Sequence, residues 1–306
     1  MPTVTTLKGQ NFRTFMWDET GQKWYAIAMA TNCTITLTNN TQDAAHKDIA
    51  GLANLPTVVS KSWQVSVESF DMSDVGSLLS AMKNKTKLKV AWGESSVADS
   101  TVFNPSANYS RQGFAYLSDC TFTFNDRENS TKSIQFTGAS ELQAVSGSDE
   151  SGEISAAAYT KGQNVRLFVS SDNEAAPTSV IAAAKSLSLH VSLQMESATT
   201  KDTTGNYDIQ EPTALSYDIS TNALVRSADT IESQVGGNSL SDIAAIYEAG
   251  TPVLWKIANT SGANNRTAGS TIVSGSAIVT QLTINAAVKN TVTYDSQFTG
   301  YGEYNL

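Results

Sequence analysis

Apolar and polar residues alternate along most of this chain, which is the pattern of strands that bury one face. In the N-terminal half, the alternation predicts strands at residues 12–17, 32–37, 63–67, 87–92, 113–124 and 131–137. In the C-terminal half, it predicts strands at residues 165–169, 187–193, 217–221, 253–257, 275–284 and 292–298. We therefore expect a mainly β protein, closed as a sandwich or barrel.

One short helix interrupts the strands in each half. The first carries an apolar stripe at helical spacing, made of Val75, Leu78, Leu79 and Met82. The second carries the stripe Ile243, Ile246 and Tyr247. We expect Ser73 and Ser241 as N-caps and Gly250 at the end of the second helix.

Each half also contains a polar segment that is too long for a tight turn, at residues 39–60 and 196–216. Long insertions in compact domains are usually functional, so each segment is predicted to form an arm.

An internal repeat organises the whole chain. The tetrapeptide Lys-Gly-Gln-Asn at 8–11 recurs at 161–164, and Gln-Phe-Thr-Gly at 135–138 recurs at 297–300. Two identical peptides in the same order predict a tandem duplication. We expect a first domain at 1–145, a linker rich in Ser, Gly and acidic residues at 146–157, and a second domain at 158–306.

The repeat accounts for the two cysteines. Cys33 and Cys120 stand where the other half has Leu187 and Leu282. Alternation places Cys33 on one strand face with Ile35 and Leu37. Both cysteines are therefore predicted to be buried thiols in the core rather than redox or metal-binding groups.

Composition limits the class of protein. Hydrophobic residues make up 40% of the 306 residues and charged residues only 16%, which suits strands with hydroxyl-rich outer faces. The formal net charge is −9, and both halves are acidic, which argues against a domain that binds nucleic acid through its phosphates. The chain begins without a basic region followed by an apolar one, so we expect no signal peptide. No apolar run is long enough for a membrane helix, and we expect no membrane binding.

Enzymatic chemistry is poorly supported. The two histidines, His46 and His190, have no Cys or carboxylate at ligand spacing. Phosphate-binding glycine loops and a nucleophile elbow are absent from the sequence. We therefore expect no enzyme activity, no metal and no cofactor. The alternating lysines Lys83, Lys85, Lys87 and Lys89 are interpreted as a solvated or subunit-contacting strand face rather than a DNA site, because the second half lacks them.

Short polar residues occupy the strand faces opposite the core. They are Thr34, Thr36, Thr38, Gln64, Ser66, Glu68, Ser188, His190, Ser192, Asp218, Ser220 and Asn222. Such a face would make a wet, weakly repulsive wall. It equally fits the ordinary solvent side of a sheet, and the residues alone leave both interpretations open.

The order of these features resembles one known family. The carrying segments are Ser-Trp-Gln-Val-Ser-Val-Glu-Ser-Phe at 62–70, Gly-Phe-Ala-Tyr-Leu at 113–117 and the closing Ser-Ile-Gln-Phe-Thr-Gly at 133–138. With the long arm and the capped helix, they resemble the major tail (tail tube) proteins of long-tailed bacteriophages. The resemblance covers both halves and implies a tandem duplication of a tail-tube-like β domain with one short helix per domain.

The resemblance implies a virion protein that assembles into stacked rings around a lumen, with inner strands joined between subunits. A duplicated chain would form rings of three copies with pseudo-sixfold symmetry. The partners would be other copies of the chain, a tape measure protein, the tail tip or baseplate, a terminator and DNA in transit. The protein would be made in the cytoplasm of the host bacterium and end in the virion tail, contractile or not.

The resemblance also gives roles to two residue sets. The twelve polar positions above would face the lumen. The arms would contact the neighbouring ring through Asn40, Gln42, Asp43, His46, Lys47, Asp48, Thr199, Lys201 and Asp202.

Three other functions stay open. A tandem β-sandwich for carbohydrate binding or adhesion would expose aromatic platforms, with candidates Trp17, Trp24, Trp63, Trp92 and Trp255. A terminator or baseplate hub would use the same fold without polymerising. An enzyme is the third alternative, and it is disfavoured because the sequence shows no set of catalytic residues.

Overall fold

The computed structural model describes residues 9–19, 22–44, 54–94, 109–145, 159–170, 176–203, 205–225, 237–261 and 267–306. The fold is mainly β, with long antiparallel strands, as the alternation predicts. The elements of the N-terminal half are η1 (Gly9–Asn11), β1 (Phe12–Asp18), β2 (Lys23–Ala26), β3 (Ala30–Asp43), β4 (Pro56–Ser69), α1 (Val75–Lys83), β5 (Lys87–Glu94), β6 (Arg111–Asn125), β7 (Thr131–Gly138) and β8 (Gln143–Ala144). Those of the C-terminal half are η2 (Gly162–Asn164), β9 (Val165–Val169), β10 (Ser179–Val180), β11 (Ala184–Ser197), β12 (Gln210–Leu224), α3 (Leu240–Ala249), β13 (Val253–Ser261), β14 (Thr267–Asn285) and β15 (Thr293–Asn305).

The predicted strands are all present, but the arms differ from expectation. Both described ends of the polar segment at 39–60 are strand, because β3 continues to Asp43 and β4 begins at Pro56. The short strands β2, β8 and β10 were not predicted, since two to four residues give too little alternation to recognise.

The described strands form one fifteen-stranded sheet. In the N-terminal half, their order is β2-β1-β5-β6-β7-β4-β3, and in the C-terminal half it is β10-β9-β13-β14-β15-β12-β11. Each half has seven strands in this order, and strands at the same place in the two orders (strands of the same rank, such as β3 and β11) correspond. The predicted linker at 146–157 lies outside the described residues, so the domain limits 1–145 and 158–306 stay a prediction.

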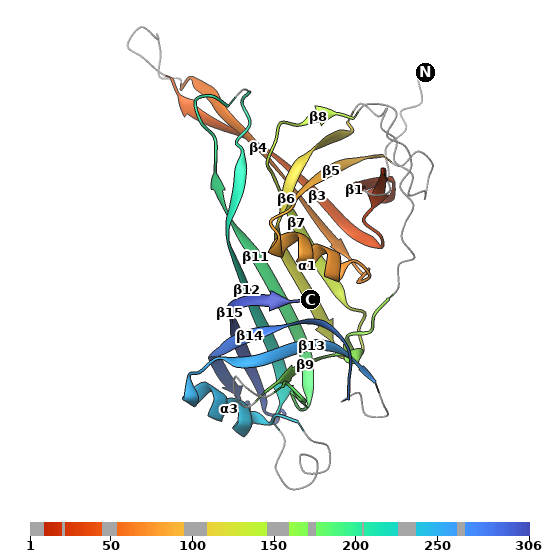
Figure 1. The fold of residues 1–306 in the computed structure, drawn as a ribbon, viewed down its shortest axis with the longest axis vertical. Coiled ribbons are helices and arrows are strands. Elements are labelled where there is room, and N and C mark those ends of the chain that lie inside the picture. Colours follow the sequence, from red (N-terminus) through yellow and green to blue (C-terminus); the bar gives the residue numbers. More distant parts are fainter. Residues whose placement is uncertain are drawn as a thin grey trace.

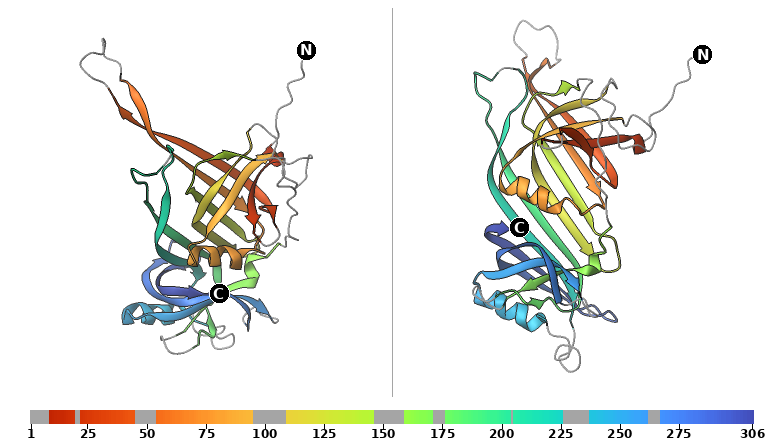
Figure 2. Two further views of the ribbon diagram at one scale, coloured as in Figure 1. Left: turned by 45° about the horizontal axis from the view of Figure 1, so that its top comes forward. Right: turned by 45° about the vertical axis from the view of Figure 1, so that its right-hand side comes forward.

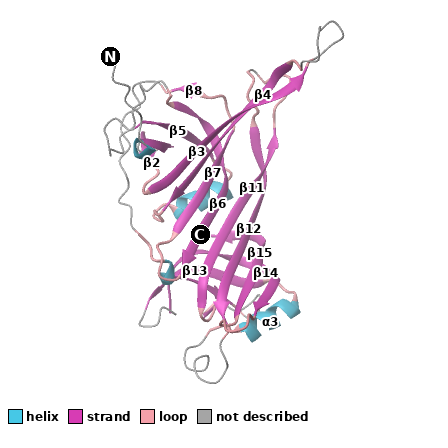
Figure 3. Ribbon diagram, turned by 180° about the vertical axis from the view of Figure 1, so that it is seen from behind, coloured by secondary structure: helices cyan, strands magenta, loops and turns pink. Residues whose placement is uncertain are grey.

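The sheet folds into two layers around a shared core. The strands β3, β4, β7, β6, β11, β12, β15 and β14 are neighbours in the sheet in that order, and Figure 3 shows them with α1 behind. β6 joins the layers: Arg111–Tyr116 pairs with β5, and its later residues pair with β7 and β11. One buried cluster contains residues of both halves, among them Trp63, Phe122, Leu189, Tyr217 and Trp255.

The N-termini of the two helices differ from the predicted N-caps. Ser73 is not the N-cap of α1; Asp74 is, and it makes no side-chain cap bond. Ser73 instead donates to the Asp71 carboxylate, and the Asp74 carboxylate accepts from the buried Lys132 ammonium. In α3, the cap is Ser239 rather than Ser241. The carboxylate of Asp242 accepts from the Ser239 amide and completes a capping box there.

The cysteine prediction is confirmed for one residue and only partly for the other. Both thiols are free, and Cys120 is fully buried. Burial raises the pKa of the Cys120 thiol well above its ordinary value, as expected of an inert core cysteine. Cys33 is half-buried, and its neighbour Leu37 is 63% exposed, so the predicted core face of β3 is open in the single chain.

The repeated Phe-Thr-Gly peptide has a packing reason. A Cβ at Gly138 would lie 2.4 Å from the Trp63 ring, and one at Gly300 would lie 2.6 Å from the Tyr217 ring. In both halves, an aromatic side chain therefore lies flat against the glycine backbone. Only glycine leaves room for it.

We predict that Gly138→Ala and Gly300→Ala each destabilise the protein by about 1–3 kcal/mol, because the added methyl displaces a buried ring. The free energy of unfolding from urea titration measures this. Gly76→Ala in α1 is the matched control, since nothing lies within 4 Å of its Cβ position. That change should stabilise by about 0.5–1 kcal/mol. An equal effect of all three substitutions would contradict the packing argument.

Candidate assembly surfaces

The two halves are joined by direct strand pairing, which we call the internal joint. It is formed by β6 and β11, antiparallel, from Asn125 opposite Ser186 to Asp119 opposite Ser192. The two strands come from different halves, so the sheet passes from one half to the other without a break. Figure 1 shows β11 running from the C-terminal half up alongside β6.

The internal joint buries apolar side chains on its core side. Cys120 and Phe122 of β6 lie opposite Val191 and Leu189 of β11, and all four are buried. On the other face, His190 Nε2 lies 2.7 Å from Asp119 Oδ2, with both side chains about 40% exposed. At that exposure, the pair contributes about 0–1 kcal/mol, so the apolar contacts hold the joint.

Two further contacts reinforce the internal joint. The Tyr304 hydroxyl donates to the Leu79 carbonyl in α1 at 2.6 Å, and Lys83 Nζ donates to the Tyr304 carbonyl at 2.8 Å. At the other end, the Asp208 carboxylate accepts from Ser60 and from Asn40. The C-terminal half thus holds the N-terminal half at the helix and at the arm.

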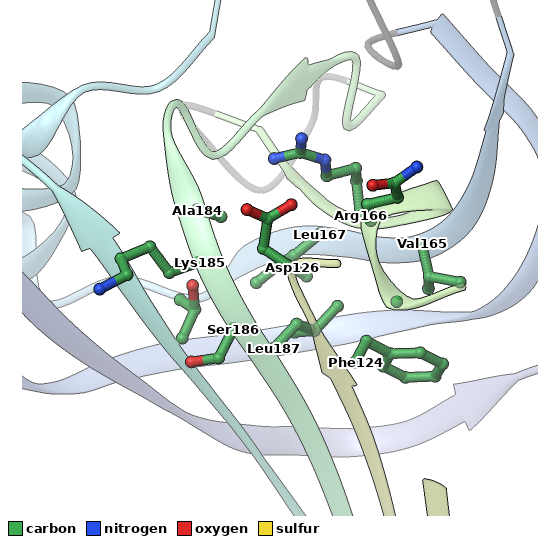
Figure 4. A pocket seen from close by; sticks show the side chains of 12 residues that line it. Phe124, Asp126, Val165, Arg166, Leu167, Ala184, Lys185, Ser186 and Leu187 are labelled. Atoms are coloured by element: carbon green, nitrogen blue, oxygen red, sulfur yellow. The ribbon is translucent and has the colours of Figure 1, made fainter. Parts of the chain in front are cut away.

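A tightly packed glycine closes the lower end of the internal joint. A Cβ at Gly162 would lie 2.3 Å from the Asn125 carbonyl oxygen, so η2 rests directly on the β6 backbone. The surrounding cavity holds only about 20 Å³, room for about one water. Figure 4 shows Asp126 and Arg166 at this cavity. Burial lowers the pKa of the Arg166 guanidinium, against the opposing effect of Asp126. The cavity is too small for an organic ligand.

Besides the short strands β2, β8 and β10, two long strands of the described chain have an edge without a partner. β3 pairs with β4 alone, and the last residues of β14, from Ile278 to Asn285, pair with β15 alone. Large apolar side chains stand exposed on these edges: Leu37 at 63% and Ile284 at 54%. Open strand edges with exposed apolar residues are templates for pairing with another chain.

The twelve polar positions predicted from the sequence lie on one face of one sheet. In the N-terminal half, Thr34 is opposite Ser66 and Thr36 is opposite Gln64. In the C-terminal half, His190 is opposite Asp218, and Ser188 is opposite Ser220. We call this face the polar wall. It includes positions that we did not predict, on β6, β7, β14 and β15: Asp119, Thr121, Thr123, Ser133, Gln135, Thr137, Gln281, Thr283, Asn285, Asp295, Gln297 and Thr299.

The polar wall is acidic and internally hydrogen-bonded. Its carboxylates belong to Glu68, Asp119, Asp218 and Asp295, and none of its described positions is Lys or Arg. The Asp218 carboxylate accepts from Thr299 at 2.9 Å, and the Asp295 carboxylate accepts from Asn222 and Asn285 at 2.6 Å each. A hollow of about 500 Å³ lies on the wall between the halves, beside Gln135 and Ser192. The wall is therefore ordered, hydrophilic and negative.

The predicted arm residues lie on two neighbouring hairpins. In Figures 1 and 2, the β3–β4 hairpin projects beyond the rest of the sheet. The tip of the β11–β12 hairpin meets it where Lys61 bridges to Tyr207. Asn40, Gln42 and Asp43 are on β3, and Thr199, Lys201 and Asp202 are at the second tip. The predicted His46, Lys47 and Asp48 lie outside the described residues.

The lysine run forms no single basic face. Lys83 and Lys85 donate to backbone carbonyls of the C-terminal half, at Tyr304 and Thr213. Lys87 lies over the Tyr116 ring, and Lys89 lies 4.5 Å from the centre of the Trp17 ring. All four side chains therefore have partners within the chain.

The described ranges also bear on three other features: a metal site, a membrane span and a sugar-binding surface. Three or more His, Cys, Asp or Glu residues do not come together there as a metal site. No helix in those ranges has the length and apolar character of a membrane span. Trp24, Trp63, Trp92 and Trp255 are buried, and Trp17 is half-buried. None of the five tryptophans offers an exposed platform for a sugar.

No family model and no curated protein matches this chain. Among solved structures, the chain is similar to the tail of an empty gene transfer agent (GTA) particle refined with C6 symmetry, with 13% identity, a TM-score of 0.36, and coverage of 48% of this chain and 97% of that one. It is similar to the SPP1 tail tube, with 16% identity, a TM-score of 0.34, and coverage of 46% and 75%. For the virion of the native gene transfer agent particle, the identity is 13%, the TM-score is 0.32, and coverage is 47% and 96%.

We predict different amide hydrogen exchange in two strands of equal rank. β11 is paired on both sides along Ser186–Ser192, so its amides should exchange slowly. β3 is paired on one side, so about half of its amides between Asn32 and Thr38 should exchange fast. Peptide-resolved exchange of the single chain in solution measures this. Equal protection of both strands would show that the β3 edge is covered in the single chain.

Proposed function

We propose that this chain is the structural subunit of a virion tail tube, which assembles into stacked rings and lets DNA pass through the lumen. The carrying observation is that eight neighbouring strands, from β3 to β14, present one acidic polar wall and end in two unpaired edges. The addition of further copies would close a sheet of this kind and satisfy both edges.

The chemistry of the polar wall suits a conduit for DNA. Nucleic acid binds proteins mainly through contacts of Lys and Arg with phosphates, and the described wall offers neither. Its hydroxyl, amide and carboxylate groups keep water at the surface and repel a polyanion weakly. DNA would therefore slide past the wall instead of being held. This favours the lumen interpretation of the twelve polar positions over an ordinary solvent face.

The internal joint supports the ring. Each chain would contribute its two similar halves as consecutive sectors, and three chains would give a ring with pseudo-sixfold symmetry. The joints between chains would then alternate with the joints inside them. The sequence resemblance to major tail proteins supplies this stoichiometry, and the open edges of β3 and β14 supply the means of closure.

The arms would link successive rings. Asn40, Gln42 and Asp43 with Thr199, Lys201 and Asp202 lie on the two hairpins, away from the shared core. Leu55, Val58 and Val59 are exposed on the β4 side of the first hairpin, as suits a surface that another ring covers. The further partners would be a tape measure protein, the tail tip or baseplate and a terminator, and the final location the virion tail.

A non-polymerising tail component with the same fold is the second candidate. It shares the polar wall but needs no closed stack of rings. The adhesion alternative loses its main support, because the tryptophans that would bind sugar rings are not exposed.

We predict that the purified protein forms rings or tubes with six lobes around a hole at high concentration, alone or seeded with tail-tip components. Negative-stain electron microscopy with the mass in solution tests this. A particle built from three chains supports the stoichiometry. A strictly monomeric protein that forms no rings even when seeded contradicts the tube and favours the non-polymerising component.

We predict that Glu68→Lys with Asp218→Lys slows DNA ejection from assembled particles at least several-fold, because cations on the wall bind phosphates. The slowing should diminish as salt is raised. Glu19→Lys is the control and matches each single wall substitution in charge, since Glu19 lies in the β1–β2 turn away from the wall. Unchanged ejection by particles that assemble normally would remove the lumen assignment.

A further inference from the structure

The open end of β14 has the same surroundings as the part of β6 that binds β11. We propose that β14 and α3 of one chain bind β3 and η1 of the next chain in the register of the internal joint. This outer joint rests on the proposed ring and specifies its contacts.

The C-terminal parts of β6 and β14 pair with the following strand in the same way. Asp119 of β6 lies opposite Gln135 of β7 after an irregularity at Leu117, and Gln281 of β14 lies opposite Gln297 of β15 after an irregularity at Val279. β14 thus repeats the bulge that positions β6.

β3 likewise matches β11 through its pairing with the following strand. Ile35 is opposite Val65, and Leu189 is opposite Ile219. Transferring the internal register, in which Thr121 faces His190, places Thr283 opposite Thr36 of the next chain. The neighbouring pairs are then Ile284 with Ile35, and Leu282 with Leu37.

The exposed apolar residues are those that this register would cover. Phe122 and Val191 are buried at the internal joint, whereas their counterparts Ile284 and Leu37 are more than half exposed. Every other β11 residue from Leu187 to Leu193 is buried, whereas β3 has no buried residue. The single chain therefore leaves a core face open on both outer edges, and the outer joint closes them together.

A repeated glycine points to the same contact. Gly162 is required because a side chain would strike the β6 backbone at Phe124 and Asn125. Gly9 repeats it in the Lys-Gly-Gln-Asn peptide, yet nothing lies within 4 Å of its Cβ position. In the outer joint, Gly9 lies against Ala286 and Ala287, which directly follow β14 and match Phe124 and Asn125 in the repeat. This gives the glycine a steric reason that the single chain lacks.

The helices add a fourth correspondence. Leu79 in α1 is fully buried, and its carbonyl accepts from Tyr304 of the C-terminal half. The matching residue in α3 is Tyr247, predicted from the sequence as part of the buried stripe but 48% exposed. In the outer joint, the segment 140–142 of the next chain, which matches 302–304, covers this ring.

The two joints differ in charge. The internal joint carries the His190–Asp119 pair, and the outer joint has Thr36 and Gln281 at those positions. The strand pairing of the outer joint is therefore neutral. Added salt should therefore not weaken ring formation, because it breaks no ion pair of this strand pairing and screens the repulsion between the acidic chains.

Cysteine cross-linking tests the register. Thr36→Cys with Thr283→Cys, in a Cys33→Ala background, changes only polar-wall positions besides Cys33. Directly opposite cysteines satisfy disulfide geometry, so mild oxidation of assembled rings should link most chains covalently. Thr34→Cys with Gln281→Cys is the matched control, displaced by four residues along β14, and should link few chains.

Three results of this experiment have distinct meanings. Efficient linking of the first pair alone supports the outer joint. Rings that link the control pair instead, or neither pair, overturn the register while the proposed function stands. A parent chain that forms no rings overturns both.

Gly9→Ala tests the glycine contact independently. The single chain should keep its melting temperature, because the methyl enters open space, while ring formation falls at least tenfold. Gly76→Ala is the control, since its Cβ position is equally open. Tyr247→Asp should also block rings and Tyr247→Phe should not. Normal ring formation by Gly9→Ala overturns the placement of η1.

Discussion

The need of every strand for hydrogen-bonding neighbours on both sides governs this molecule. A backbone edge left open exposes unpaired N–H and C=O groups, and a sheet of long strands cannot hide them by folding alone. Within the chain, β6 meets this need by pairing with β11, so that the two halves share one sheet and one core. At β3 and β14 the same need is unmet, and the remaining features of the surface, including the exposed Leu37 and Ile284, follow from that.

The polar wall shows how one sheet can be specific and non-adhesive at once. Its core side fixes the register, because a slip of one residue would turn the apolar set outward. Its other side carries short groups that satisfy one another, as Thr299 does for Asp218 and Asn222 for Asp295. Ordered carboxylates without cations keep a charge of one sign on the surface. The same strands therefore combine strong pairing along the sheet with weak attraction for anything that passes over it.

Alternation predicted the long strands and the twelve wall positions, and helical spacing predicted both helices, because period and burial are local properties of the sequence. It failed where the cause was not local. The pairing of β6 with β11 joins distant segments, and nothing near Thr121 indicates His190 as its neighbour. Leu37 and Tyr247 were predicted as core residues because the pattern marks apolar positions and does not reveal that the single chain leaves them exposed. The wall positions on β6 could have been found, since assigning Cys120 and Phe122 to the core leaves Asp119 and Thr121 for the other face.

The His190–Asp119 contact has a consequence for synthesis. The N-terminal half leaves the ribosome first, and in the proposed assembly β6 then has two competing partners: its own β11, not yet made, and β3 of another nascent chain. Only β11 brings an imidazole to Asp119, whereas β3 brings Thr36 to the same place. Tethering adds to this preference, because a segment of the same chain is present at an effective concentration of about millimolar. In the proposed assembly, the chain would thereby complete its own sheet before it joins other copies.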